Sequence, residues 1–555
     1  MDNYNNAANI KEIRSGLLIV PVWAEGHALL ARLLWQTGMH TEAMASFQKA
    51  IELQPEKLEW KLAFLDCQMR RGDEAGAVPE LLKIVSDNIN DANTVISAVS
   101  IIGSVARHDI AIRCLKWCLG KRPDEATLKA ALASELISAG QVAEGCALFI
   151  KLIQQSEKNI YYLPVLVSAP GWTGAFEQAL QIAEFFYGMP NTEHPSLLSN
   201  IGNLMIALNR SKEAMPFYER AFLQSPENEQ MRFGLAVAYL KSGDYEKGWK
   251  QNELRPSVQK LPESKPWRGK GSISGKTLLL PGDQGMGDVI QFVRYIPYLT
   301  SLGARLILVV CTPLVRLFRT LPWPVEVRDL SEQISTEHDF NCPLLSLPLA
   351  LMHYIGTEIP HDVPYFFPYA KDVSRFAWLR DKPGRKKIGL VWSGRARPEY
   401  GIAYRARSTS LEAFAPITSQ AGVTFVNLQF GEPAGELQSL KGISIVDPMN
   451  DVRDMADTAA IIENLDLVIS VDTSVAHLAG ALGKPVWMLT RSDCCWRWLE
   501  NRDDTPWYPT MRIFRSQPGS LDHAIALAAE ELQRVLHDNA PEAACILNSE
   551  YEALT

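Results

Sequence analysis

The sequence has few cysteines, no long apolar run and no surplus of positive charge, and each shortage excludes a class of protein. Nine cysteines among 555 residues are too few and too scattered for a disulfide scaffold. Neither Cys114 with Cys118 nor Cys494 with Cys495 has a second pair at zinc-site spacing, so we expect reduced, structural thiols. No stretch approaches the roughly 18 apolar residues that a membrane span needs. The formal charge of −8 argues against binding of nucleic acid or anionic membranes.

The remaining composition is typical of a soluble globular protein. The chain is 47% hydrophobic and 21% charged, which excludes disordered and fibrous classes, and its length predicts about three or four folding units. The apolar run Leu17–Ala24 resembles the core of a signal peptide, but it is short, contains Pro21 and lacks a small-residue cleavage site. We therefore predict a cytoplasmic protein.

A spacing of 34 residues runs through the first half of the sequence, with one slip of a single residue. Glycines mark most points of this spacing, and Ala106 and Asn209 stand at the others; the glycines are Gly38, Gly72, Gly140, Gly174 and Gly243. Five residues after each point comes a small residue: Ala43, Ala77, Ala111, Gly145, Ala179, Ala214 and Gly248. Four residues further on, most repeats have a bulky residue: Phe47, Leu81, Leu115, Phe149 and Tyr218.

This pattern predicts a helix–turn–helix unit repeated seven times. The residue at each point turns the chain with a positive φ, the small residue lets the two helices approach, and the bulky residue fills the space between them. One unit cannot bury its own apolar face, so the units stack into a solenoid with a concave groove. The pattern resembles the tetratricopeptide repeat family over residues 22–250, and we assign residues 1–250 to this α-solenoid. Such grooves usually bind an extended peptide or another protein; the alternative is a scaffold or a surface for homo-oligomers.

After Trp249 the helical period stops and a different fold is predicted. Residues 251–272 are rich in Pro, Gly, Lys and Ser and form a linker. Short apolar strands separated by helical patterns then predict two Rossmann-like α/β domains, residues 273–380 and 381–537, followed by a tail at 538–555. The predicted strands are 276–280, 305–311, 387–392, 423–430, 442–447, 465–470 and 485–490. We expect a ligand in the cleft between these domains, and we expect the amphipathic stretch 522–536 to pack across that cleft.

The first candidate site is the glycine-rich turn Gly282–Asp288. Its three glycines let backbone N–H groups approach a ligand, and a helix begins behind them. The spacing differs from the dinucleotide-binding fingerprint. A carboxylate would repel a phosphate, so Asp288 is better suited to a hydroxyl group or a cationic transition state. The other interpretation is that Asp288 caps the helix.

The second candidate site begins where a predicted strand ends, at Val471. Asp472, Thr473 and Ser474 start a helix there, and His477 follows one turn later on the same face. This arrangement predicts a phosphate-binding helix start supplied with a neutral or cationic imidazole. The alternative is an Asp cap and a structural histidine.

Both turns together resemble the heptosyltransferase-like glycosyltransferases of the GT-B fold, which are similar to glycosyltransferase family 9. GMGD (285–288) and DTSVAHLAGALGKPVW (472–487) carry this resemblance. Three further segments resemble the subgroup that is fused to tetratricopeptide repeats: LVWSG (390–394), NLQFG (427–431) and WRWLENRDDTPWYPTMRIFR (496–515). The resemblance covers about residues 275–515. It implies an α-solenoid followed by a GT-B glycosyltransferase of two Rossmann-like domains, with the acceptor on the first and the nucleotide-sugar on the second.

The resemblance also assigns roles to residues. Asp288 is implied as the general base that deprotonates the acceptor while the anomeric configuration inverts. Nucleotide-sugar binding is implied for ten residues: Gly285, Gly287, Ser393, Gly394, Arg407, Gln429, Asp472, Thr473, Ser474 and His477. No metal and no other cofactor is expected, because helix dipoles and basic side chains stabilise the leaving diphosphate.

The segment after Gly394 departs from the resembled subgroup. It reads RARPEYGIAYRARS (395–408), without the usual Asn-Pro and His and with a few extra residues. Its arginines form either a solvated loop or a clamp on a phosphate or an acidic sugar. ADP-heptose follows from the resemblance as donor, and UDP-, GDP- and CMP-linked sugars stay open. Trp507 and Tyr508 either belong to the core or stack on the donor.

The leading hypothesis is an inverting, metal-independent glycosyltransferase whose repeats recruit a protein acceptor. By the resemblance, that acceptor is flagellin or another surface protein. One alternative is a glycan- or lipopolysaccharide-directed enzyme similar to heptosyltransferases. The other is a repeat-based scaffold with an inactive transferase domain, and the joint presence of Asp288, Thr473 and His477 argues against it.

Overall fold

The computed structural model describes residues 2–155, 163–164, 167, 176–186, 193–255, 266–332, 338–380, 385–394, 407–438, 444–517 and 520–537. The chain divides into two compact units, Met1–Ala175 and Phe176–Thr555. This boundary lies inside the predicted repeats and not at residue 250. The repeats after residue 175 therefore belong to the same unit as the α/β domains.

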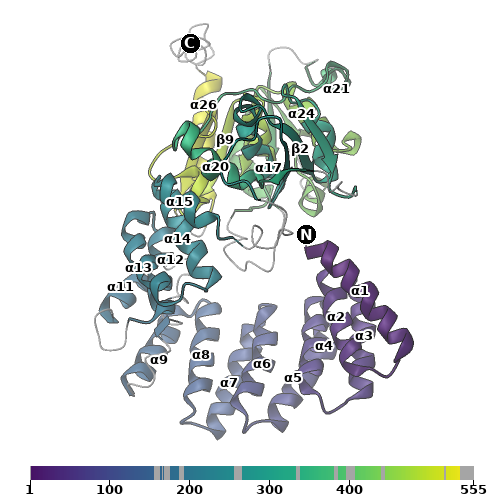
Figure 1. Ribbon diagram of the computed structural model, residues 1–555. Coiled ribbons are helices and arrows are strands. Elements are labelled where there is room, and N and C mark those ends of the chain that lie inside the picture. The colour runs from purple at the N-terminus through teal and green to yellow at the C-terminus, as the bar shows by residue number, and fades with distance from the viewer. Residues whose placement is uncertain are drawn as a thin grey trace. The chain divides into compact units, whose positions relative to one another are not determined.

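The described part of the first unit is built of α-helices, and each helix packs against its neighbour in the chain (Figure 1). The helices are α1 (Asp2–Ile19), α2 (Ala24–Gln36), α3 (His40–Leu53), α4 (Leu58–Arg70), α5 (Glu74–Asp87), α6 (Ala92–Ser104), α7 (His108–Lys121), α8 (Ala126–Ser138) and α9 (Val142–Gln155). The second unit opens with α11 (Phe176–Phe186), α12 (Pro195–Ala207), α13 (Ser211–Gln224), α14 (Glu229–Ser242) and α15 (Tyr245–Asn252).

Helix pairs follow the 34-residue spacing, as predicted. Every described residue at a point of the spacing has a positive φ: Gly38 (83°), Gly72 (85°), Ala106 (65°), Gly140 (82°), Asn209 (58°) and Gly243 (85°). Gly174 lies outside the described residues. The small residues are buried between the paired helices. At Gly145, for example, a Cβ would lie 2.6 Å from the carbonyl oxygen of Ala133, so the backbones of α8 and α9 are in contact and only glycine fits.

Two parallel sheets follow the repeats in the second unit. The first has the order β3-β2-β1-β4, from β1 (Thr277–Pro281), β2 (Arg305–Val310), β3 (Val325–Asp329) and β4 (Phe340–Asn341). The second has the order β10-β9-β8-β5-β6-β7, from β5 (Lys386–Val391), β6 (Val423–Asn427), β7 (Ile445–Val446), β8 (Leu467–Val471), β9 (Val486–Arg491) and β10 (Met511–Ser516). In the register, Gly389 pairs with Val426 on one side and Val468 on the other.

Helices accompany both sheets and complete two Rossmann-like domains. The helices are α17 (Met286–Phe292), α18 (Ile296–Ser301), α19 (Thr312–Phe318), α20 (Leu347–Ile355), α21 (Ala370–Arg375), α23 (Ala415–Thr418), α24 (Met455–Glu463), α25 (Ser474–Ala481) and α26 (Asp522–His537). The predicted fold class, an α-solenoid followed by a GT-B arrangement of two parallel α/β domains, is confirmed. The seven predicted strands are present, and β3, β4 and β10 are additional.

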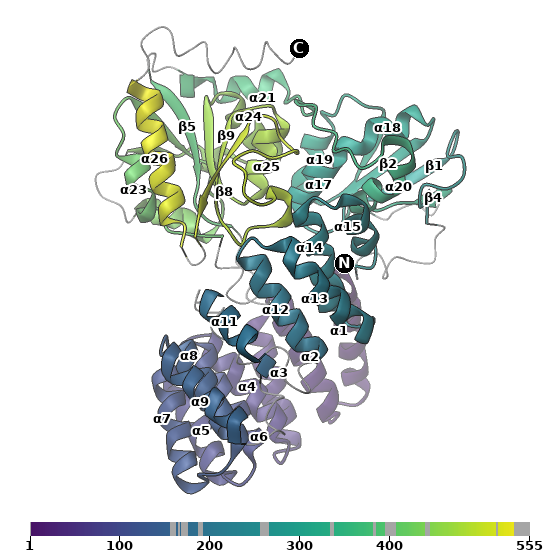
Figure 2. The same ribbon diagram turned by 90° about the vertical axis from the view of Figure 1, so that its left-hand side faces the viewer.

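The expectation that the last helix packs across the cleft is wrong. Helix α26 packs against β9, β10 and α23, all in the second α/β domain (Figure 2). Its apolar face, with Ala524, Ile525 and Ala528, is buried in one cluster with Phe425 and Leu489 of the second sheet. The amphipathic pattern predicted a buried face correctly but could not say which surface covers it.

A buried charge network joins the two α/β domains. Asp457 on α24 is fully buried, and its carboxylate lies 2.5 Å from Arg316 on α19, 2.9 Å from Arg375 and 2.8 Å from Arg453. Burial alone would raise the pKa of Asp457, but hydrogen bonds from Arg453 and Arg316 hold it below its ordinary value. The carboxylate is therefore ionised and links an arginine of the first domain to the second domain.

Candidate active site

The candidate turns lie at the carboxyl ends of parallel strands. In the second sheet β6 lies on one side of β5 and β8 on the other, so the strand order reverses between β5 and β8. Ligands of open α/β sheets bind outside the carboxyl ends at such a switch point. Ser393 and Gly394 follow β5, and Asp472 and Thr473 follow β8. The Gly282–Asp288 turn follows β1, whose neighbours β2 and β4 likewise lie on opposite sides.

The two candidate turns are in direct contact. Helices α17 and α25 pack together, and Gly287, in the first turn of α17, lies against α25. A Cβ at this position would lie 2.8 Å from Cδ2 of His477 and 3.5 Å from Cα of Ser474. Only glycine leaves room for this approach. The structure therefore brings together residues of two motifs that are far apart in the sequence.

The two carboxylate oxygens of Asp288 have different partners. Oδ2 accepts a 2.8 Å hydrogen bond from the backbone N–H of Gly285, so the helix-cap interpretation is correct. Oδ1 accepts a hydrogen bond from Nη2 of Arg497. The Asp288 side chain is also 20% exposed, so the carboxylate is not wholly enclosed by these partners.

Arg497 contacts Asp288 and is a residue of the site that the sequence did not reveal. It is buried in the short helix η9 (Trp496–Trp498), and its Nε donates to Oε1 of Gln291 at 2.6 Å. Burial lowers the pKa of Arg497, but the charge of Asp288 raises it above its ordinary value. The available signal was an arginine between two tryptophans in a segment already quoted for its resemblance. Nothing in that pattern named Asp288 as its partner.

His477 is a buried, neutral imidazole. Its Nδ1 shares a 3.0 Å hydrogen bond with the hydroxyl of Tyr508. Burial, followed by the charges of Arg497, Arg294 and Arg407, holds the pKa of His477 well below its ordinary value. Burial also raises the pKa of Tyr508 well above its ordinary value, so both groups are uncharged near neutral pH. Three arginines acting on one imidazole indicate a positive potential around it.

The two aromatic residues near the chain end belong to the core. Trp507 and Tyr508 are fully buried, which supports the core interpretation and not stacking on a donor. Arg294, also buried, lies 4.6 Å from the centre of the Tyr508 ring and donates to the hydroxyl of Tyr365 at 3.0 Å. Arg294 is a second buried cation of the site that the sequence did not identify.

Gln429 shapes the turn that follows β5. Its Oε1 accepts hydrogen bonds from two backbone N–H groups, 3.1 Å and 2.9 Å long, and its Nε2 donates to the carbonyl of Ser393 at 2.9 Å. The N–H of Gly394 donates to the hydroxyl of Ser408 at 3.0 Å. A Cβ on Gly394 would lie 3.1 Å from Nε of Arg407. The contacts of Gln429 thus support a structural role in this turn, with Arg407 beside it.

The backbone N–H groups at the start of α25 have no side-chain cap and are open to a hydrogen-bond acceptor. Thr473 is its N-cap residue and makes no side-chain cap hydrogen bond; its hydroxyl lies 3.1 Å from that of Ser470 instead. Asp472, Thr473 and Ser474 are partly exposed. The first backbone N–H groups of the helix can therefore meet an anion.

Three arginines of the altered loop, Arg395, Arg397 and Arg405, lie outside the described residues. The thiol of Cys495 accepts a hydrogen bond from Arg497 at 3.1 Å, and that of Cys494 accepts one from Arg515 at 3.0 Å.

In the described ranges no group of three or more His, Cys, Asp or Glu side chains is placed to hold a metal ion. Nor does that part of the chain contain a helix with the length and apolar character of a membrane span.

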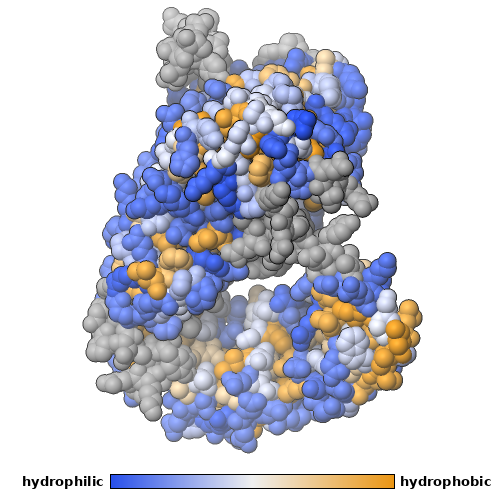
Figure 3. Space-filling model, in the orientation of Figure 1, coloured by the Kyte–Doolittle hydropathy of each residue, from blue (hydrophilic) through white to orange (hydrophobic). Residues whose placement is uncertain are grey.

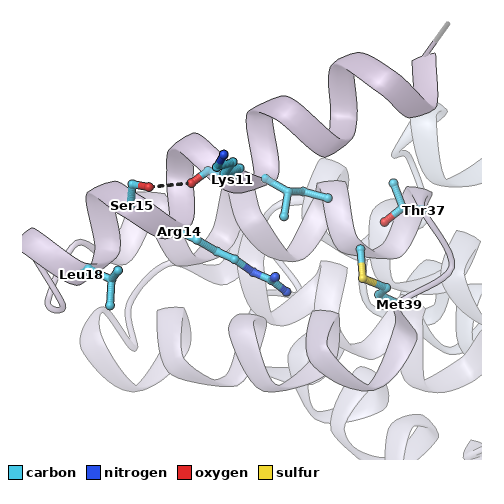
Figure 4. A pocket seen from close by; sticks show the side chains of 7 residues that line it. Lys11, Arg14, Ser15, Leu18, Thr37 and Met39 are labelled. Atoms are coloured by element: carbon cyan, nitrogen blue, oxygen red, sulfur yellow. Dashed lines mark hydrogen bonds between the residues drawn. The ribbon is translucent and has the colours of Figure 1, made fainter. Parts of the chain in front are cut away.

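A separate pocket of about 520 Å³ lies in the first unit (Figure 4). Helix α1 and the turn after α2 form it, and its lining residues are Ile10, Lys11, Arg14, Ser15, Leu18, Thr37 and Met39. The lining combines the cations Lys11 and Arg14 with hydroxyl and apolar side chains. Apolar side chains gather on the surface of this part of the unit (Figure 3), where Leu18 is 84% and Ile19 82% exposed.

Comparison with known proteins adds to this picture. Residues 24–57 match the family model of the tetratricopeptide repeat, and these residues contain the pair α2 and α3. Protein FlbA of Caulobacter vibrioides is 28% identical to this chain over 463 residues, which cover 77% of this chain and 70% of FlbA.

Two solved structures are each similar to about half of this chain. A glycosyl transferase of family 9 from Veillonella parvula is 12% identical, covers 49% of this chain and 91% of its own, and has a TM-score of 0.34. The ADP-heptose lipopolysaccharide heptosyltransferase II of E. coli is 14% identical, covers 47% of this chain and 98% of its own, and has a TM-score of 0.35.

Proposed function

We propose that the α/β domains transfer a sugar from a nucleotide-sugar donor to an acceptor, with inversion and without a metal. The observation that carries this proposal is the contact of Gly287 with Ser474 and His477. Because of this contact, the helix of Asp288 begins beside the helix start that can meet an anion. An acid–base group and an anion site in one cleft are the two elements that sugar transfer from a nucleotide diphosphate needs.

In the proposed reaction Asp288 acts on the acceptor. Its carboxylate takes the proton of the acceptor hydroxyl or amide. At the same time the hydroxyl oxygen or amide nitrogen forms a bond to the anomeric carbon. The bond between the anomeric carbon and the diphosphate oxygen breaks, and the diphosphate leaves with the electron pair. Attack from the face opposite the leaving group inverts the anomeric configuration. Proton transfer of this kind contributes about 10²- to 10⁴-fold to a rate.

Positive charge around His477, from two buried arginines and the partly exposed Arg407, supports a diphosphate as the leaving group. Arg294, Arg407 and Arg497 all act on the imidazole of His477, and the imidazole itself is neutral. The first N–H groups of α25 add the positive end of a helix. A diphosphate placed there would be stabilised by fixed charges and dipoles, which is the role a metal ion has in other transferases.

The acceptor that we propose is a protein, such as flagellin or another surface protein, recruited by the tetratricopeptide repeats. Stacked helical repeats present extended surfaces that suit a peptide chain. The proposal predicts that the repeats bind acceptor and that the α/β domains bind donor, so the two affinities can be measured separately.

Donor binding is tested by thermal unfolding of the full chain against ADP, UDP, GDP, dTDP and CMP with EDTA present. A ligand at about 100 times its Kd adds about 2.7 kcal/mol of stability. A shift with one nucleotide supports the proposal, and no shift with any of them contradicts it.

Catalysis is tested with Asp288→Asn, which keeps the helix cap but cannot take a proton. We expect turnover to fall about 100-fold or more, while the thermal shift with nucleotide persists. The control is Glu326→Gln, which removes an exposed carboxylate of the same domain, paired with Arg328; it should leave turnover unchanged. An Asp288→Asn protein with normal turnover would exclude Asp288 as the base.

A further inference from the structure

The last repeats contact the segment Ser492–Glu500 of the candidate site. This segment contains η9 and therefore Arg497, whose guanidinium contacts Asp288. The residues on both sides of Arg497 are held by α13, α14 and α15, which belong to the last two repeats of the second unit.

Lys241 on α14 holds both ends of this segment. Its side chain is 0% exposed, and its Nζ donates to the backbone carbonyl of Ser492 at 3.2 Å and to that of Ile206 at 3.1 Å. The same Nζ lies 4.0 Å from Oε1 of Glu500. A buried ammonium group needs such partners because the loss of hydration is costly. The contacts therefore hold the Lys241 ammonium group in place, and the same contacts hold Ser492 and Glu500 against α14.

Two further contacts fix the same segment to the repeats. The backbone N–H of Ser211, at the start of α13, donates to Oε1 of Glu500 at 3.2 Å, and the Ser211 hydroxyl donates to the same oxygen. The indole of Trp249 on α15 meets Trp496 edge-on at 5.4 Å and Phe292 at 5.9 Å between ring centres. Phe292 ends α17, the helix of Asp288, so one side chain of the last repeat contacts both the neighbour of Arg497 and the helix that carries Asp288.

The guanidinium of Arg497 is itself held in a single orientation. It donates to Asp288 and to Gln291, which lie three residues apart on one face of α17. Its flat face lies 4.2 Å from the centre of the Trp496 ring. A planar fork that spans two acceptors fixes both of them, which a lysine at this position cannot do.

We propose that Arg497 is a positioning residue that fixes the carboxylate of Asp288 for proton transfer, and that Lys241, Ser211 and Trp249 of the last repeats fix Arg497. This inference rests on the proposed function. It makes the last two repeats a part of the transferase site, in addition to any recruitment of an acceptor.

The decisive variants are Arg497→Met and Arg497→Lys in the full chain, assayed for kcat, KM and nucleotide Kd. We expect kcat to fall about 100-fold in Arg497→Met, more than nucleotide affinity does, because a misplacement of about 1 Å has an effect of this size. If lysine restores kcat fully, Arg497 acts by charge alone and the positioning role is overturned. An Arg497→Met protein with kcat within about threefold of wild type overturns it as well.

The link to the repeats is tested with Lys241→Met and with Glu500→Gln, which loses the charge but keeps the shape of the side chain. Both should lower kcat about tenfold with an unchanged nucleotide Kd, since a smaller displacement of Arg497 follows. The matched control is Lys250→Met on α15, where an exposed lysine pairs with Glu246; its kcat should equal that of wild type. If both test variants match this control, the repeats do not fix Arg497.

A double-mutant cycle separates this inference from the proposed function. Asp288→Asn and Arg497→Met are combined, and the melting temperatures of the four proteins are compared without any substrate. Coupled side chains give shifts that do not add, whereas independent ones do. If the wild-type protein transfers no sugar, the proposed function fails, and additive shifts in the cycle overturn the positioning of Asp288 by Arg497 independently of it.

Discussion

Replacing Gly287 by alanine adds one methyl group at the contact between the two turns. The new Cβ would lie 2.8 Å from Cδ2 of His477, whereas carbon atoms make favourable contact at about 3.5 Å or more. His477 is buried and bonded to Tyr508, and the backbone at Ser474 is 3.5 Å from the same Cβ, so neither can yield freely. Helices α17 and α25 must therefore separate by about 0.7 Å at this point.

The expected consequence is a displaced Asp288 and a weaker anion site. Overpacking of this kind costs about 1–3 kcal/mol of stability, and a shift of this size lowers kcat/KM by up to about 100-fold. The assay measures kcat/KM with the donor that thermal unfolding identifies, together with the melting temperature. Gly435→Ala is the matched control, because a Cβ there meets nothing within 4 Å. A Gly287→Ala protein with the melting temperature and kcat/KM of the control would refute the direct contact between the turns.

Three further predictions follow from other parts of the structure. His477→Gln should reduce the loss of stability between pH 7.5 and 5.5. Because burial lowers the pKa of His477, the neutral imidazole contributes stability above a pH of about 6.5, and this contribution is lost as the pH falls, by up to about 1.4 kcal/mol per pH unit. Urea unfolding at the two pH values measures the loss, and equal losses in the variant and the wild type would contradict the prediction. Asp457→Asn should cost about 3 kcal/mol, because it leaves three arginines without their shared carboxylate; a loss below about 1 kcal/mol in the same assay would mean that the network contributes little to the joint between the α/β domains. Ala106→Gly should raise the melting temperature of the repeats. Ala106 has a φ of 65°, and the strain of this conformation in alanine, about 1–2 kcal/mol, exceeds the free-energy cost of the entropy that glycine adds to the unfolded chain. A lower melting temperature would contradict the prediction.

The repeats could be predicted because their pattern depends on local geometry. A turn between paired helices needs a positive φ. Every described residue at a point of the 34-residue spacing has one, including Ala106 and Asn209. A close approach of two helices needs a small side chain, as at Gly145. Such requirements recur in each unit, so coincident positions in the sequence reveal them.

The strands and the two glycine or hydroxyl-rich turns could also be predicted, because each occupies a continuous stretch of sequence. The short strands β3 and β4 and the edge strand β10 were missed. Strand β4 has two residues, and β3 and β10 contain charged residues between their apolar ones, so none forms a continuous apolar run.

What the sequence determined by itself was therefore the fold class, the order of its parts and the positions of Asp288 and His477, because each follows from residues that are close together along the chain. The partners of these residues were decided by the tertiary structure. Arg497 reaches Asp288, and Lys241 reaches Ser492, across more than 200 residues of chain. Contacts of this range depend on how complete elements pack, and packing matches whole surfaces that no local pattern describes. For the same reason the apolar face of α26 could be recognised in the sequence, while the sheet that covers it could not.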